Sequence, residues 1–122
     1  MSEVVMIGDV EYIPKSEAVS TKIEFAKADH EICMVRTYSA GVFYGELESL
    51  KETTGIVLNA RRVHSWSGSA SLSELAQRGS SNTKGCRMPV KVSKVILTQV
   101  IEVIPMTREA YDNLESVEIW TK

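Results

Sequence analysis

The residues best suited to chemistry gather in one stretch, NARRVHSWSGSASLSEL, residues 59 to 75. Arg61 and Arg62 carry planar guanidinium groups whose forked donors match the oxygens of a phosphate. His64 and Trp66 offer flat rings on which a nucleobase can stack. These residue types in this order predict a pocket for a ligand that has an anionic part and a flat part.

Three serines follow the tryptophan, at positions 67, 69 and 71, where a helix is expected to begin. Their hydroxyls and the free backbone N–H groups of a helix start can donate to phosphate or ribose oxygens. Gly68 would let the backbone approach such a ligand closely. The alternative interpretation is a plain strand–loop–helix junction, with Trp66 in the core and the two arginines as surface ion-pair partners.

Two further stretches carry cations. In VRTYSAGVFYGEL, residues 35 to 47, Arg36 and Tyr38 share a strand face near a tight turn, although the rings of this segment could simply pack a hairpin. In SSNTKGCRMP, residues 80 to 89, Lys84 and Arg87 could close over a charged ligand, and a solvated loop is the alternative. Gly45, inside a predicted strand, indicates a bulge or a close backbone approach.

No catalytic constellation is present in the sequence, so an enzyme is the least favoured class. The two histidines and two cysteines lack metal-ligand spacing, and we expect neither a metal nor a cofactor. Cys33 and Cys86 are predicted to be reduced thiols of a cytoplasmic protein, with a single disulfide as the alternative.

Composition limits the class of protein further. The 122 residues suffice for one domain, and 14 basic against 16 acidic residues give a net charge of −2. A protein that coats long nucleic acid would be more basic, because its affinity comes from neutralising phosphates. The sequence has no apolar run of about 18 residues and no signal-peptide pattern at its start, so we expect no membrane contact.

The elements that must position these residues follow from periodicity and caps. Strands are predicted over 31–39 and 42–49 around a tight turn, over 56–66, as one or two strands over 90–104, and over 117–120. Helices are predicted after Ser71, whose capping box is completed by Glu74, and after Thr107. We therefore expect an α+β fold, a small bent antiparallel sheet or barrel with two short helices, over residues 31–122. Residues 1–30 are expected to form an N-terminal hairpin around Gly8 and a variable segment.

Strand alternation predicts which side chains share a face. Over 56–66 it places Arg62, His64 and Trp66 on one face and Arg61 on the other. Over 31–39 it places Ile32 and Met34 on one face and Cys33 and Val35 on the other.

The motifs RTYSAGVF and NARR…W.G.ASLS.LA, followed by a cysteine-containing loop and a terminal VEIW, resemble a family of small tailed-phage proteins. The resemblance covers roughly residues 31 to 121. Positions 64 and 65 are usually aromatic in that family, so His64 and Ser65 depart from its pattern. Proteins of this kind are similar to the nucleotide sponges that phages use against CBASS and Thoeris defence.

That resemblance implies a phage protein of the host cytoplasm that binds and sequesters a cyclic di- or trinucleotide messenger without cleaving it. It also implies a homo-oligomer, a dimer or tetramer, with sites at subunit interfaces. The ligand-binding residues expected on this basis are Arg36, Tyr38, Arg61, Arg62, Trp66, Ser67, Ser69 and Ser71. The alternative is a structural or protein-interaction module anchored by Trp66 and Arg62. A single-stranded nucleic-acid binder is a third option, against which the net charge argues.

Overall fold

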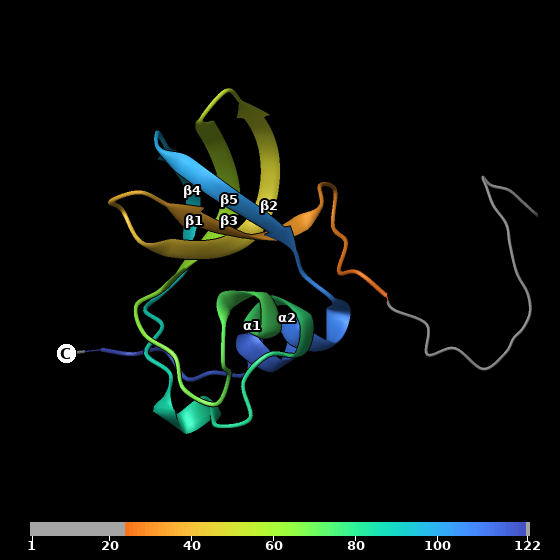
Figure 1. Ribbon diagram of the computed structural model, residues 1–122, viewed down its shortest axis with the longest axis vertical. Helices are drawn as coiled ribbons and strands as arrows, with labels where there is room; N and C mark the ends of the chain where they lie inside the picture. Colours follow the sequence, from red (N-terminus) through yellow and green to blue (C-terminus); the bar gives the residue numbers. More distant parts are fainter. Residues whose placement is uncertain (1–23, 122) are drawn as a thin grey trace, which may run out of the picture.

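The computed structural model describes residues 24–121, which form a bent antiparallel sheet with two short helices packed against one end of it (Figure 1). The strands are β1 (Ile32–Thr37), β2 (Val42–Lys51), β3 (Thr54–Val63), β4 (Val92–Leu97) and β5 (Val100–Pro105). The helices are α1 (Leu72–Arg78) and α2 (Arg108–Glu115), with a 3₁₀ turn over Thr83–Gly85. The predicted α+β class is confirmed. The hairpin predicted around Gly8 lies outside the described residues.

The sheet has the order β4-β3-β2-β1-β5, and every neighbouring pair is antiparallel. β4 and β5 are consecutive in the chain and are joined by Thr98 and Gln99 alone, yet they occupy the two opposite edges. The sheet must therefore curl strongly, because a connection this short cannot cross a flat sheet of five strands. No ladder joins β4 to β5 within residues 24–121, so the curled sheet is not a closed barrel.

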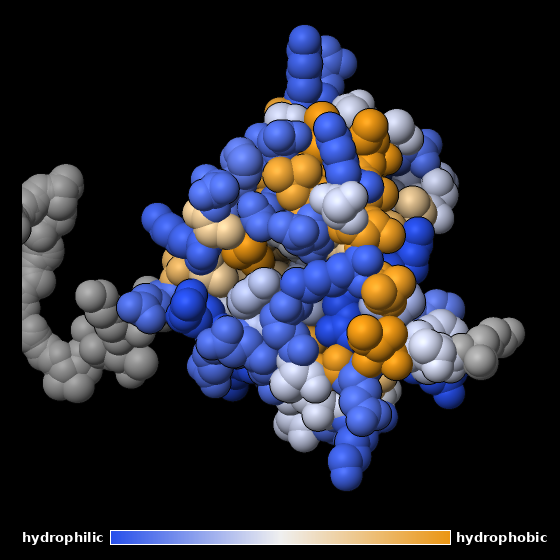
Figure 2. All heavy atoms as spheres, turned by 180° about the vertical axis from the view of Figure 1, so that it is seen from behind, coloured by the Kyte–Doolittle hydropathy of each residue, from blue (hydrophilic) through white to orange (hydrophobic). Residues whose placement is uncertain are grey.

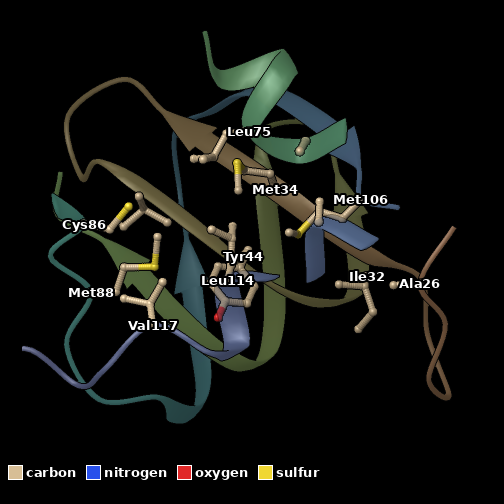
Figure 3. Close-up of a cluster of buried hydrophobic side chains, with 13 residues drawn as sticks. Ala26, Ile32, Met34, Tyr44, Leu75, Cys86, Met88, Met106, Leu114 and Val117 are labelled. Carbon is tan, nitrogen blue, oxygen red and sulfur yellow. The ribbon is translucent and has the colours of Figure 1, made fainter. Parts of the chain in front are cut away.

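The curl separates two cores. The helix-side core lies between the sheet and the helices, and its members include Met34, Tyr44, Leu75, Met88 and Leu114 (Figure 3). The sheet core lies on the other face, and its members are Cys33, Val35, Phe43, Val57, Ala60, Leu97 and Val100. Alternate residues of β1 enter different cores, as predicted, which explains why this strand is apolar on both faces.

Both helices begin as the sequence predicts. The Ser71 hydroxyl accepts from the backbone N–H of Glu74, and the Thr107 hydroxyl accepts from that of Ala110. Gly79 ends α1 with a φ of 79°. Neither helix is long and apolar enough to span a membrane, in the part of the chain from residue 24 to 121.

Two predicted strands, those over 56–66 and 117–120, are shorter at their ends than predicted. The strand predicted over 56–66 ends at Val63, and Asn59 within it has a φ of 49°, which brings Val57 and Ala60 to the same core. The strand predicted over 117–120 is reduced to one bridge between Met88 and Ile119. The run over 90–104 forms two strands. Gly45 does mark an irregular register, and a Cβ there would lie 2.7 Å from the carbonyl oxygen of Leu58.

Candidate ligand-binding site

Arg61 is a structural residue of the interior, with 3% of its surface exposed. Its guanidinium donates five hydrogen bonds, to the carbonyl oxygens of Val117 (2.8 Å), Leu114 (3.0 Å), Pro89 (3.0 Å) and Met88 (3.2 Å) and to the Tyr44 hydroxyl (3.4 Å). One side chain therefore joins the end of α2, the residues after it and the segment before β4 to the last part of β3. Its donors are occupied by other residues of the protein.

A carboxylate completes this interior cluster. Glu115 accepts from the Tyr44 hydroxyl at 2.6 Å and pairs with the Lys91 ammonium at 2.6 Å. Burial alone would raise the pKa of Glu115, but these two hydrogen bonds and the charges of Lys91 and Arg61 hold the pKa below its usual value. Burial, aided by the bond to Glu115, raises the pKa of Tyr44, which keeps the phenol protonated as a donor.

The lowered pKa of Glu115 predicts an acid-sensitive contribution to stability. A carboxyl whose folded pKa is depressed stabilises the fold above its unfolded value of 4.5, and this contribution is lost as pH falls through the folded pKa. We expect Glu115→Gln to destabilise the protein at pH 7 and to cost progressively less as the pH falls below 4.5. Urea unfolding of both proteins across that range measures the difference, and a difference that stays constant with pH would contradict the assignment.

Arg62 points away from Arg61, as strand alternation predicts. Its guanidinium lies 4.3 Å from the centre of the Phe43 ring and donates to the carbonyl oxygen of Ala40 in the β1–β2 turn. Trp66 instead packs against the helix-side core. The prediction that these two residues share a face is wrong, because β3 ends at Val63 and the alternation does not continue to Trp66.

Arg36 and Tyr38 also lie at this end of the sheet, without forming a pocket with Trp66. Arg36 pairs with Glu102 at 3.0 Å, and Tyr38 is 77% exposed. In the ladder between β1 and β2, Arg36 is paired with Val42, which packs toward the helix-side core. Arg62 instead lies over Phe43, which belongs to the sheet core. Arg36 and Arg62 are therefore on opposite faces of the sheet.

The serine-rich loop is held by the chain itself. The Ser67 and Gly68 carbonyl oxygens accept from the Ser80 hydroxyl and the Ser81 backbone N–H, the latter at 3.0 Å. The Ser69 hydroxyl contacts the Ser71 carbonyl oxygen at 3.2 Å. The Glu74 carboxylate accepts from the Ala70 N–H at 2.7 Å, so an internal anion occupies the start of α1. The backbone that approaches Gly68 is that of residues 81 and 82.

Cations and rings do converge elsewhere, around a pocket of about 630 Å³ between the loop over 83–87 and the segment over 116–121. Its lining residues are Thr83, Lys84, Cys86, Arg87, Ser116, Glu118, Ile119, Trp120 and Thr121. Lys84 and Arg87 are the two cations predicted to close over a charged ligand. Trp120 belongs to the terminal VEIW, which periodicity assigned only to a strand.

The ring system of this pocket joins segments that are distant in sequence. The rings of His64 and Trp120 stack with centroids 4.8 Å apart and an interplanar angle of 19°. The Arg87 guanidinium lies 5.9 Å from the centre of the Trp120 ring. Two backbone hydrogen bonds hold this arrangement. The N–H of His64 donates to the carbonyl oxygen of Arg87 (3.0 Å), and the N–H of Trp120 donates to the carbonyl oxygen of Met88 (3.0 Å).

The charged side chains of the pocket are not neutralised by each other. Lys84, Arg87 and Glu118 form no side-chain hydrogen bond or ion pair with any residue between 24 and 121. Cys86 is 7% exposed, and its thiol lies 3.6 and 3.7 Å from the carbonyl oxygens of Asn82 and Ser67. Both Cys86 and Cys33 are free, as predicted, and burial together with the charge of Glu31 raises the pKa of Cys33 to about 12.

Residues 30–114 match a protein family described as "Domain of unknown function (DUF6948)". The match contains all five strands and the loop over 83–87, and it ends before the segment over 116–121. No curated protein and no solved structure matches the chain.

Proposed function

The chain belongs to the DUF6948 family, and from the geometry of its pocket we propose that it binds a small ligand of the nucleotide class. In its full form, the proposal is a phage protein that sequesters a cyclic di- or trinucleotide messenger of CBASS in the host cytoplasm. The observation that carries the proposal is the pairing of Trp120 with Arg87 beside Lys84 in one pocket.

The pocket supplies the contacts that a nucleotide needs. Its volume of about 630 Å³ falls within the common range of ligand pockets, about 300–1,000 Å³. The Arg87 fork and the Lys84 ammonium suit phosphate oxygens. His64 stacks on Trp120 with the ring centroids 4.8 Å apart, and we propose that a base stacks on the opposite face of the indole.

Binding without cleavage is the form of the proposal that the pocket chemistry supports. Cys86 is the thiol that lines the pocket, and its side chain is buried and directed at two backbone carbonyl oxygens. We propose that the ligand is released intact when the protein unfolds.

A homo-oligomer, a dimer or tetramer, completes this proposal. Each subunit contributes one indole and one pair of cations, whereas a cyclic dinucleotide carries two bases and two phosphates. Two pockets related by a two-fold axis would match the symmetry of that ligand.

A panel of cyclic di- and trinucleotides and cyclic ADP-ribose isomers tests the proposal by thermal shift. We expect at least one compound to raise Tm, and mass spectrometry of the heated mixture to recover it intact. Trp120→Ala should weaken binding about 5- to 150-fold, since stacking contributes about 1–3 kcal/mol per base. Arg87→Ala should weaken it too.

Arg62→Ala is the matched control, because Arg62 lies over Phe43 and does not line the pocket. Its affinity should equal that of the unmodified protein. The proposal fails if no compound at high micromolar concentration raises Tm. The site assignment fails if Arg62→Ala abolishes binding while Trp120→Ala leaves it intact. Recovery of degraded ligand would indicate a nuclease.

Protein interaction is a second candidate function, favoured by apolar side chains on the edge strand β4. Figure 2, the view from behind, shows apolar side chains gathered in a band to the right of centre. Val92 and Ile96 of β4 and Val90 before it are exposed large apolar residues. Light scattering measures whether the protein self-associates: a monomer would contradict the proposed homo-oligomer and leave the apolar face of β4 open to another protein.

A further inference from the structure

The ligand pocket has one acidic side chain, and it faces the same space as the two cations. Glu118 lines the pocket with Lys84 and Arg87 and forms no ion pair with either of them in the described part of the chain. It stands two residues before Trp120 in the chain, and both residues line the pocket. The pocket therefore has two cations on the loop over 83–87 and one carboxylate on the segment that carries the indole.

A carboxylate beside the indole selects for hydrogen-bond donors on the ligand. It would repel a phosphate, so the phosphate must lie toward Lys84 and Arg87, and the base edge toward Glu118. An ionised carboxylate only accepts hydrogen bonds, with two oxygens that can receive two parallel N–H groups. The part of a ligand that matches both oxygens presents two adjacent donors.

Among the common bases, guanine presents two adjacent donors on its Watson–Crick edge, N1–H and the 2-amino group. Adenine and cytosine place a ring nitrogen acceptor beside their single amino group, and uracil places its N3–H between two carbonyl oxygens. Those acceptors would face the lone pairs of the carboxylate. We propose that the base bound at Trp120 is guanine, recognised by Glu118, an inference that rests on the proposed function.

The test compares cyclic diguanylate with cyclic diadenylate, and guanosine with inosine and adenosine monophosphates, by calorimetric titration. Inosine monophosphate keeps N1–H and lacks the 2-amino group, so it isolates one of the two donors. We expect guanine ligands to bind about 10- to 100-fold more tightly than adenine ligands, with inosine between them. Glu118→Gln should remove most of this preference and leave the affinity for adenine ligands within about threefold.

Glu109→Gln is the control, because it makes the same change of charge on an exposed residue of α2 that does not line the pocket. It should leave both affinities unchanged. Equal binding of guanine and adenine ligands, or a preference that survives Glu118→Gln, would overturn the guanine inference and leave the proposed function standing. If none of the nucleotides binds, the proposed function itself fails.

Discussion

Replacing Arg61 by methionine is expected to lower the free energy of unfolding by about 3–5 kcal/mol, the cost of breaking a buried charged cluster. Methionine fills much of the same volume but donates nothing, so the carbonyl oxygens that Arg61 satisfies at the end of α2 and before β4 lose their partner. Urea unfolding followed by circular dichroism measures the change.

The adjacent arginine provides the control for this substitution. Arg62→Met changes the same charge on the same strand, but the Arg62 side chain is exposed and makes one hydrogen bond and one ring contact. Its effect should stay within about 1 kcal/mol. Equal effects at positions 61 and 62 would mean that the buried hydrogen bonds of Arg61 contribute little. Arg61→Lys should be intermediate, because lysine keeps the charge without the planar fork.

Gly68→Ala is expected to destabilise the protein by about 2–4 kcal/mol, combining an unfavourable positive φ with a steric clash. Gly68 has a φ of 77°, and a Cβ there would lie 2.5 Å from the backbone nitrogen of Asn82 and 2.9 Å from that of Ser81. Backbone atoms cannot move aside as a flexible side chain can, so the loop over 67–69 would separate from the loop over 80–82. Thermal and urea unfolding measure the loss.

Gly41→Ala separates the two causes. Gly41 has a φ of 94°, but a Cβ there would meet only the end of the flexible Arg62 side chain, at 3.4 Å. This variant should therefore lose only the conformational part, about 1–2 kcal/mol. If Gly68→Ala costs no more than Gly41→Ala, the contact between the two loops is looser than the structure indicates.

Local signals in the sequence predicted most of the elements. The helix caps at Ser71 and Thr107 could be predicted because capping depends only on residues three or four positions apart. Ser71 begins a capping box, and Thr107 is a threonine just before a helical pattern. The turn at Gly41 and the irregular register at Gly45 were readable because glycine marks positions that other residues fill poorly. Alternation correctly placed Arg61 and Arg62 on opposite faces.

The same local signals did not predict which residues distant in the sequence come together. Alternation separates Arg61 from Arg62 but does not say which one α2 will cover, and that choice depends on tertiary packing. Arg62, His64 and Trp66 would share a face only if β3 continued to residue 66. The strand ends at Val63 instead, and Ser65 forms an isolated bridge with Arg87. Trp120 reaches His64 only because the bridge at Ile119 returns the end of the chain to Met88.

The pairing of β1 with β5, which are distant in the chain, has a consequence for the order of folding during synthesis. β1 pairs with β5, so the first described strand lacks one of its neighbours until residues 100–105 have left the ribosome. β2 and β3 can pair as soon as their own hairpin emerges, because that contact is local. We therefore expect nascent chains that end before residue 100 to hold a hairpin and no stable domain, and chaperones to engage them through the unpaired edge of β1.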